Sequence, residues 1–344
     1  MTYRQCSKCL MDTTDPDITF DSRGVCNHCR QYDADEEQRQ SEIKKLPIIL
    51  SKLKKDGCLL GLSGGVDSAM CLHYLVQNGI KPLCFSLDNK WNTPQSEENI
   101  KNLVKKTGVN FFDYKIDNSR FLGLQVAFLM GGIKNVEAVT DHLLFAATYE
   151  LAAMYGIKYV VSGGNLATEN TMPAAWGEDP RDLHWIKSVY KKVMGEKLTG
   201  LPMISLFKEQ YYRLIKRIKF VRLLDYYDYN RAEAIELLKR EYDFKEYGEK
   251  HCENVFTWWF QNYYLFEKWG IDKRKAHLSS LIHSGQITRE EAMIDLGKNP
   301  VYPQIGLERK VMSYPKKSYN DYHNSRLIRK LVILLYKYAK NLAM

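Results

Sequence analysis

The sequence has no long hydrophobic run and no recognisable export signal. None of its apolar stretches approaches the ~18 residues that a membrane-spanning helix needs. The opening residues, MTYRQCSKCLMD, lack the apolar core of a secretory signal peptide. Internal repeats and low-complexity tracts are also missing. These absences argue against a transmembrane segment and against secretion, and we expect a cytoplasmic protein.

Two common nucleotide-binding patterns are missing as well. The chain contains neither the Walker A sequence G-x4-G-K-[ST] nor the dinucleotide fingerprint G-x-G-x-x-G. It also lacks a recognisable glutaminase nucleophile, because residue 2 is threonine rather than cysteine and no Gly-x-Cys-x-Gly elbow occurs. We therefore do not expect a P-loop NTPase, a dinucleotide-binding enzyme or a chain that hydrolyses glutamine by itself.

The composition is that of an ordinary globular protein with a basic excess. The 344 residues are 45% hydrophobic and 26% charged, which allows a sizeable core plus one or two smaller modules. Fifty Lys and Arg residues against 41 Asp and Glu residues give a net charge of +9. This excess suits an anionic substrate, a nucleotide or a nucleic acid, and it does not choose among them.

The cysteines give a sharper signal. Four of the eight form two Cys-x-x-Cys pairs: Cys6, Cys9, Cys26 and Cys29. In a reducing compartment this spacing is typical of a zinc ribbon, and four-thiolate zinc sites are usually structural. A redox or sulfur-handling role is the alternative, and His28 is a possible replacement for one cysteine ligand. We expect a zinc-ribbon module and linker over residues 1–45, folded by its metal.

From residue 58 onward, short apolar runs alternate with longer helical patterns. The predicted helices cover 66–78, 94–107, 121–130 and 140–156. The predicted strands cover 58–62, 82–88, 109–116 and 157–162. Such alternation with continuously apolar strands predicts an α/β fold, a parallel sheet with helices on both faces. Ligands on such sheets bind at the carboxyl ends of the strands.

The first predicted strand runs into the sequence SGGVDS, residues 63–68. Its two glycines let the backbone approach a phosphate closely, and the following helix directs free N–H groups and a positive dipole end at an anion. The plainer interpretation is an ordinary turn capped by Ser63 or Asp67. We favour a phosphate-binding loop because both serines, both glycines and the aspartate occur together between a strand and a helix.

This loop resembles the pyrophosphate loop of the N-type ATP pyrophosphatases, the PP-loop superfamily that includes asparagine, NAD and GMP synthetases and the tRNA thiolases. The resemblance implies an adenine nucleotide alpha hydrolase-like domain over residues 46–245 that cleaves ATP between its α and β phosphates. It implies that Asp67 acts in catalysis by binding Mg²⁺. It also implies a pyrophosphate site formed by Ser63, Gly64, Gly65, Asp67 and Ser68.

The same resemblance implies that the nucleotide extends over the ends of two neighbouring strands. Leu87 and Asp88 would lie near the adenosine, and Gly163 and Gly164 would line the nucleotide or the substrate. Asp88 also has a plainer interpretation as a turn aspartate that caps the next helix.

Residues 246–344 are predicted to be helical and are rich in aromatic residues. Aromatic clusters at helical spacing more often form a core or an interface than a ligand site. Lys250, Lys273 and Arg274 are candidates for catalysis, because cations beside such a core can neutralise charge on departing pyrophosphate. A solvated charge run is the alternative. We expect the basic, apolar segment 325–344 to pack against the body rather than to lie on a membrane.

The four-cysteine ribbon, SGGVDS and the block EKHCENVFTWWFQNYYLFEKWGIDKRKAHLSSLI together resemble the N-acetyl sugar amidotransferases of bacterial surface-polysaccharide and nonulosonic-acid biosynthesis. The resemblance implies conversion of an acetamido group to an acetamidino group with ATP, Mg²⁺ and ammonia, in a chain that also holds Zn²⁺. The expected substrate is an acetamido sugar, free or nucleotide-linked, of lipopolysaccharide O-antigen or nonulosonic-acid synthesis. The expected partner is a separate glutaminase with an ammonia channel, and no nucleic acid is expected.

Two rival interpretations remain. A tRNA thiolase also combines a PP-loop with zinc-binding cysteines and a basic charge, but it usually needs catalytic cysteines near the site. Cys252 has no second cysteine close to it in the sequence, while Cys58 and Cys71 flank the loop inside apolar runs. The second rival is a non-enzymatic protein that binds ATP as a regulatory ligand and uses its ribbon and aromatic region to bind another protein.

Overall fold

Five short strands form a parallel sheet at the centre of the computed structural model, which describes residues 2–248 and 250–332. The strand order is β3-β2-β1-β4-β5, and all neighbours are parallel, which confirms the predicted α/β fold. Four strands agree with the sequence prediction, whereas the fifth, at one edge, was not predicted. The strands are β1 (Cys58–Gly61), β2 (Leu83–Asp88), β3 (Asn110–Lys115), β4 (Tyr159–Ser162) and β5 (Lys219–Arg222).

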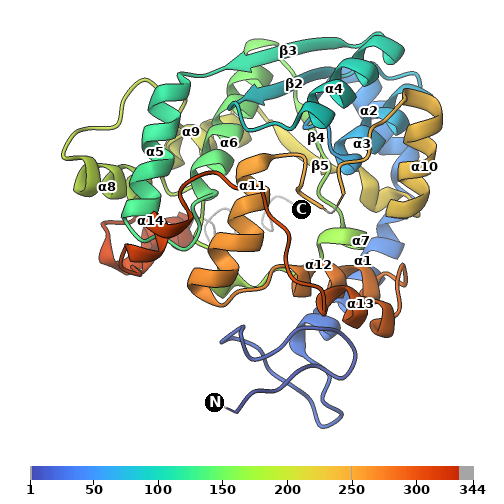
Figure 1. Cartoon of the computed structure of the whole chain (residues 1–344). Coiled ribbons are helices and arrows are strands. Elements are labelled where there is room, and N and C mark those ends of the chain that lie inside the picture. Colours follow the sequence, from blue (N-terminus) through green and yellow to red (C-terminus); the bar gives the residue numbers. More distant parts are fainter. Residues whose placement is uncertain (1, 249, 333–344) are drawn as a thin grey trace.

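Helices cover both faces of this sheet, because successive strand residues point to opposite sides (Figure 1). In β1, Leu59 belongs to one buried cluster and Leu60 to the other. The first cluster includes residues of α5 (Asn118–Met130), α6 (Ala138–Met154), α8 (Leu183–Met194) and α9 (Leu206–Leu214). The second includes residues of α2 (Leu46–Asp56), α3 (Val66–Gln77), α4 (Pro94–Thr107) and α10 (Arg231–Tyr242).

The C-terminal region shares the first of these cores. Its elements are α11 (Val255–Trp259), the π-helical segment η3 (Phe260–Lys268), α12 (Arg274–His283), α13 (Arg289–Leu296) and α14 (Glu308–Ser313). Phe256, Trp259, Phe260 and Tyr264 are buried in the same cluster as the side chains of α5, α6 and α8. The aromatic cluster is therefore part of the core.

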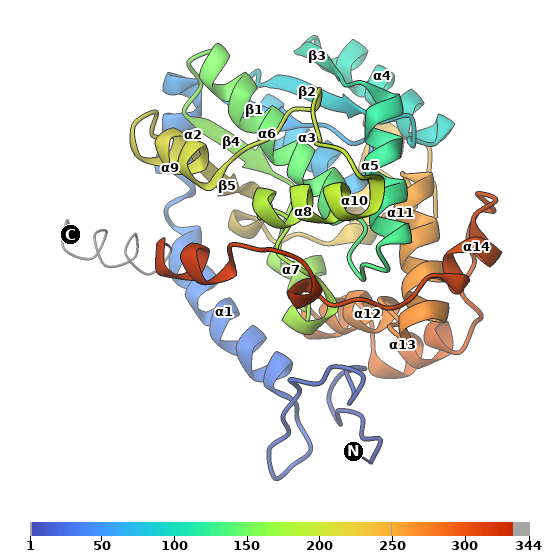
Figure 2. The same cartoon turned by 90° about the vertical axis from the view of Figure 1, so that its left-hand side faces the viewer.

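The N-terminal segment lies beneath α12 and α13, and α1 (Asn27–Ile43) leads from it to the sheet layer (Figures 1 and 2). The backbone N–H of Leu10 donates to Ser279 Oγ on α12 at 3.0 Å, and Lys275 of the same helix pairs with buried Asp12. The cysteine-rich segment is thus attached to the C-terminal region by specific polar contacts.

The end of the chain is described only in part. Of the predicted segment 325–344, residues 333–344 lie outside the described residues. Within the described part, Arg329 is buried and pairs with Asp179 and Glu209, so this portion packs against the body. No helix in residues 2–248 and 250–332 has both the length and the apolar character needed to cross a membrane.

The loop after β1 is held tightly against the start of α4. Gly64 has a φ of +77°, a conformation that favours glycine, and an added Cβ would lie 2.3 Å from the carbonyl oxygen of Ser96. The Asn99 side-chain amide donates to the Gly64 carbonyl at 3.2 Å. The loop therefore requires glycine here both for its backbone conformation and for its close approach to α4.

Replacing Gly64 by alanine should accordingly destabilise the fold by more than the left-handed backbone conformation alone explains. Gly156 is a matched control, because its φ is +66° and an added Cβ would meet nothing within 4 Å. We expect Gly156→Ala to cost roughly 1–2 kcal/mol and Gly64→Ala to cost clearly more, measured by urea unfolding. Equal losses in the two variants would contradict this account of the loop.

Candidate active site

A cavity of about 680 Å³ lies at the carboxyl ends of the central strands. The strand order reverses between β1 and β4, and open α/β sheets bind ligands at such a point. Many of the predicted site residues line this cavity. They are Ser63, Gly65, Asp67 and Ser68 of the loop, Leu87 at the end of β2, Gly163 and Gly164 after β4, and Lys250 of the C-terminal region.

Two predicted nucleotide-binding residues lie outside this lining. Gly64 faces α4, as described above. The Asp88 carboxylate pairs with the exposed Lys90 at 2.7 Å, and its neighbour Asn89 lines the cavity instead. The Asp88 carboxylate is therefore held by a surface lysine rather than at the cavity.

The two predicted cations of the C-terminal block have different surroundings. The Arg274 guanidinium binds Asp272 through two nitrogens and also donates to the carbonyls of Leu296 and Lys298, so its charge and donors are already matched. Lys273, by contrast, has no hydrogen bond or ion pair to its ammonium among the described residues. Its burial lowers its pKa, and the nearby carboxylates of Asp141, Glu137 and Glu169 oppose that shift.

The loop is organised by its own hydroxyl groups. Ser63 Oγ accepts from the Gly65 N–H at 3.2 Å, and Ser68 Oγ lies 3.1 Å from the Gly65 carbonyl to which it donates. The N-cap of α3 is Gly65, and no side chain caps the helix. This overturns the interpretation of Ser63 or Asp67 as a mere helix cap and leaves the Asp67 side chain to other contacts.

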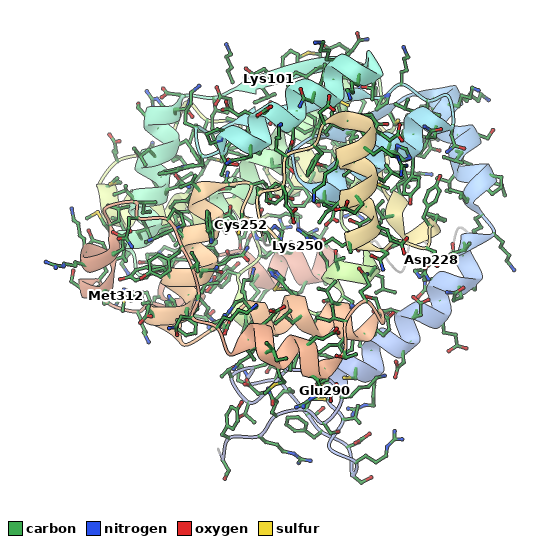
Figure 3. All side chains as sticks on the ribbon, turned by 45° about the vertical axis from the view of Figure 1, so that its right-hand side comes forward. Lys101, Asp228, Lys250, Cys252, Glu290 and Met312 are labelled. Carbon is green, nitrogen blue, oxygen red and sulfur yellow. The ribbon has the colours of Figure 1, made fainter. Side chains whose placement is uncertain are left out.

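Asp67 meets Lys250, which lies 183 residues further along the chain. Lys250 Nζ is 2.8 Å from Asp67 Oδ2, 3.0 Å from Glu169 Oε1 and 2.6 Å from Thr168 Oγ1. The Tyr229 hydroxyl donates a short hydrogen bond to the other Asp67 oxygen. Figure 3 places Lys250 at the centre of the molecule, between the sheet layer and the C-terminal helices.

These contacts fix the charges at the centre of the site. Burial alone would raise the pKa of Asp67, but the charge of Lys250 and the hydrogen bonds from Lys250 and Tyr229 hold that pKa below its ordinary value. Burial likewise works against the charged form of Lys250, and the carboxylates of Asp67 and Glu169 outweigh it, so its pKa is raised. The site therefore holds an ionised carboxylate and an ammonium group at neutral pH.

Tyr247 and Glu253 cover the loop from the other side. The Tyr247 hydroxyl accepts the Val66 N–H at 3.0 Å, and Glu253 Oε1 lies 2.9 Å from the position of a Cβ on Gly65. Burial and the charge of Asp67 raise the pKa of Glu253 to about 7. An anion that binds at this helix N-terminus therefore has to replace the Tyr247 contact and share space with Glu253.

A second, smaller cavity of about 320 Å³ shares Arg231 and Lys250 with the first. The side chain of Arg231 has no hydrogen bond or ion pair to another described residue. His251 and His277 lie close by, with ring centroids 5.2 Å apart. Burial and the positive charge of Lys250, among other nearby cations, push the pKa of both histidines well below the ordinary value, so they are neutral at pH 7.

Several of these residues were missed by the sequence analysis. Glu169 is the last residue of α7 (Leu166–Glu169), four residues after the SGGN turn. Its position near the site can be inferred only once α7 is known. Arg231 begins α10 directly after its N-cap, Asn230. No pattern in the sequence singles out Tyr229 or Tyr247, because only the packing of distant segments brings them to the loop.

The four paired cysteines form a compact cluster. Their sulfur atoms all lie within 4.8 Å of one another, with separations such as 3.7 Å between Cys6 and Cys29 and 3.6 Å between Cys26 and Cys29. Tetrahedral zinc with Zn–S bonds of about 2.3 Å requires sulfur separations of about 3.8 Å. The Cys26 N–H also donates to Cys6 Sγ at 3.2 Å, a contact that favours a thiolate.

Two histidines lie beside this cluster. His28 is not part of it, because its Nε2 binds Asp15 at 2.7 Å. His283 of α12 was not predicted, and its Nε2 lies 3.1 Å from Cys29 Sγ while its Nδ1 lies 2.7 Å from Asn170 Oδ1. The four cysteines thus fit a metal site with four thiolate ligands. His283 of α12 contacts one of them and links the site to Asn170, the residue that follows α7.

Two sequence comparisons give partial matches. Residues 253–314 match the family model described as "LPS biosynthesis protein WbpG-like, C-terminal domain". The uncharacterized protein MJ1599 of Methanocaldococcus jannaschii is 28% identical over 174 residues, which are 47% of this chain and 59% of that protein. The chain therefore spans little more than half the length of this curated relative.

Comparison with solved structures finds distant likenesses to synthetases. NMN synthetase from Francisella tularensis is 20% identical with a TM-score of 0.30, covering 53% of this chain and 71% of that one. The NH3-dependent NAD synthetase from Campylobacter jejuni is 17% identical with a TM-score of 0.31, covering 60% and 93%. NAD+ synthetase from Burkholderia pseudomallei is 13% identical with a TM-score of 0.28, covering 64% and 100%. Likenesses of this size carry no argument about activity.

The contact between Lys250 and Asp67 makes a prediction about stability. Lys250→Met leaves a largely buried carboxylate without its cation, and we expect a loss of ~3 kcal/mol in the free energy of unfolding at neutral pH. The loss should shrink as the pH falls through the ordinary range of an aspartate, because a protonated Asp67 needs no cation.

Lys90→Met is the matched control for this stability measurement. It removes the partner of Asp88 from a pair in which the lysine is 68% exposed, so its cost should stay under ~1 kcal/mol at every pH. Chemical unfolding of both variants between pH 4 and 8 makes the comparison. Equal losses for the two lysine variants at neutral pH would contradict the central role of the Lys250 contact.

Proposed function

We propose that this protein is an ATP-dependent amidotransferase that converts an acetamido group on a bacterial sugar into an acetamidino group. The amide oxygen attacks the α-phosphorus of ATP, pyrophosphate leaves, and ammonia then replaces AMP on the activated carbon. The sugar would be a precursor of lipopolysaccharide O-antigen or of a nonulosonic acid, free or nucleotide-linked. The observation that carries the proposal is the SGGVDS loop at the strand-order reversal, with Asp67 and Lys250 facing one cavity.

The chemistry accounts for the charges of the site. A neutral amide is a poor electrophile and its oxygen a poor leaving group, so activation by adenylation is needed before ammonia can add. The loop N–H groups and the start of α3 would bind the pyrophosphate, and Asp67 would hold Mg²⁺, which neutralises phosphate charge. Lys250 and Lys273 would stabilise charge on the departing pyrophosphate. Leu87 and Gly163 would position the adenosine and the substrate.

The match of residues 253–314 to a lipopolysaccharide-biosynthesis domain supports the sugar class. Glu253 and Asn254, at the start of the matched segment, line the main cavity, and Arg274 and His277 line the second one, so the segment borders the site. Since the sequence has no recognisable glutaminase nucleophile, we further propose that a separate glutaminase delivers ammonia. The purified chain should then use added ammonium salts and not glutamine.

The tRNA-thiolase alternative receives less support from the structure. Burial raises the pKa of Cys58 and of Cys84 to about 12, and that of Cys71 well above its ordinary value. None of the described cysteines lines the main cavity. Thiolation chemistry needs reactive thiolates at the site, and buried, protonated thiols do not supply them.

Mass spectrometry of candidate acetamido sugars tests the proposed reaction. With ATP, Mg²⁺ and ammonium salt, the right sugar should lose about one dalton as O is replaced by NH, and AMP and pyrophosphate should form in equal amounts. Asp67→Asn should lower turnover by 10²-fold or more while the protein remains folded, since it removes the magnesium carboxylate. Release of ADP, or an unchanged rate in folded Asp67→Asn, would contradict the proposal.

We also propose that Cys6, Cys9, Cys26 and Cys29 bind one structural zinc ion. Zinc analysis should find one ion per chain, and Cys9→Ser should lose it. Binding energies of roughly 10–16 kcal/mol are typical of such sites, so residues 1–45 should then become sensitive to proteases. Cys84→Ser, outside the cluster, should retain the metal. A metal-free Cys9→Ser protein whose N-terminal segment stays protease-resistant would argue against a structural zinc.

A further inference from the structure

The first turns of α6 form part of the wall of the main cavity, and none of their residues takes part in the proposed binding of ATP. Thr140, Asp141 and Thr148 line the cavity together with apolar residues of the same helix. Glu137 precedes Asp141 by four residues, which places the two carboxylates on one face of the helix. The wall therefore carries a carboxylate pair beside the space that the substrates occupy.

Several polar atoms in and behind this wall have no hydrogen-bond partner among the described residues. The Asp141 carboxylate accepts no hydrogen bond from any described residue. Glu137 Oε2 accepts from the Thr257 hydroxyl at 2.9 Å, but Glu137 Oε1 is shielded from solvent and has no partner. Thr140 Oγ1 is also buried without a partner. Buried polar atoms are nearly always hydrogen-bonded in folded proteins. Thr140 and Asp141 line the cavity, so their unmatched oxygens point to a ligand there that donates hydrogen bonds.

The charges around the wall favour a cation as that ligand. Asp67, Lys250 and Glu169 form a chain of ion pairs with separations of 2.8 and 3.0 Å. Lys273 is the one cation whose charge acts on both carboxylates of α6, and it lies beyond ion-pair distance from them within the described residues. Burial and the charge of Asp141 raise the pKa of Glu137 to about 8, so Asp141 is the charged carboxylate of the pair at neutral pH. Its opposite charge among the described residues, Lys273, makes no direct contact with it, so its oxygens can accept hydrogen bonds from a small cation.

The pair is also suited to accept a proton near neutral pH. Burial raises the pKa of Asp141 to about 6, and burial together with the charge of Asp141 raises that of Glu137 to about 8. Lys273 opposes both shifts, as does the Thr257 hydroxyl for Glu137. A general base works best when its pKa lies near the operating pH.

We propose that Asp141 binds ammonium and removes its proton, and that Glu137 is the positioning residue behind it. This inference rests on the proposed amidotransferase function. Ammonium gives one proton to the Asp141 carboxylate, and the freed electron pair on nitrogen forms the C–N bond. The adduct passes a second proton to solvent as the C–O bond breaks. AMP leaves with that electron pair, and the acetamidinium product remains.

Two half-reactions separate this inference from the function on which it rests. ATP–pyrophosphate exchange with the acetamido sugar needs activation but no ammonia, whereas amidine formation needs both. In Asp141→Asn we expect exchange to stay within about twofold of wild type. Ammonium-dependent amidine formation should fall by roughly 10²–10⁴-fold, the usual contribution of a general base. The KM for ATP should not change.

A neutral nucleophile distinguishes proton removal from a structural effect. Hydroxylamine is largely unprotonated at neutral pH, so Asp141→Asn should use it almost as well as wild type. Glu137→Gln should raise the KM for ammonium with a smaller loss of rate than Asp141→Asn. Burial and the charge of Asp141 raise the pKa of Glu137 to about 8, so it is largely protonated at neutral pH, and its replacement should leave the pKa of Asp141 little changed. Glu150→Gln, on the same helix but paired with Lys208 outside the cavity, is the control and should behave as wild type.

The outcomes bear on the two claims separately. Full ammonium-dependent activity in Asp141→Asn, with exchange intact, would overturn the ammonium site and leave the proposed function standing. An equal loss with ammonium and with hydroxylamine would overturn the role of Asp141 as a base. If Asp141→Asn does not fold, the wild-type pH profile tests the proposal in its place. A rate of the ammonium step that levels off once Asp141 is ionised supports the proposal, and a rate that keeps rising in proportion to free ammonia between pH 7 and 8 would overturn it. Wild-type protein that shows neither exchange nor amidine formation with any acetamido sugar would overturn both claims.

Discussion

The contact of Lys250 with Asp67 is the interaction on which the rest of the site depends. It joins the start of α3, the short helix α7 and the segment after α10 at one point, because the lysine reaches Asp67, Thr168 and Glu169 together. Tyr247, Lys250 and Glu253 of the C-terminal region line the main cavity together with residues of the sheet layer. Phe256 and Trp259 attach this region to the sheet layer, because they are buried in the same core as side chains of α5 and α6.

The cysteine cluster is connected to the Lys250 contact through α12 and the residue that follows α7. Cys29 lies against His283 of α12, and His283 binds Asn170, which directly follows Glu169. The N-terminal segment also holds α12 through Leu10 and Asp12. A metal bound by the four thiolates would therefore stabilise α7 and α12, which border the active site, although it lies outside the cavity.

Much of the fold could be predicted because its signals are local. Strand and helix periods, the SGGVDS turn and the Cys-x-x-Cys spacing each depend on neighbouring residues, and all appear in the structure at or near the predicted positions. Strand β5 was missed because its four residues, Lys219–Arg222, carry two exposed basic side chains at the edge of the sheet and lack an apolar run.

The site could be predicted only in part. Sequence reasoning proposed Asp67 and Lys250, and the structure places both at the main cavity. It did not single out Tyr229, Tyr247 or Asp141, because only packing between segments far apart in the chain brings them to the site. Arg274 was predicted for the same role as Lys250, and the structure places it at the second cavity with its guanidinium bound by Asp272. Composition cannot distinguish a matched charge from a free one.

The central claim is that the amide oxygen of the sugar attacks the α-phosphorus of ATP, and an isotope measurement tests it directly. An acetamido sugar labelled with ¹⁸O in its carbonyl should be incubated with the protein, ATP, Mg²⁺ and ammonium, and the AMP analysed by mass spectrometry. The account predicts one ¹⁸O atom in the phosphate of each AMP formed. Unlabelled AMP alongside amidine formation would contradict it.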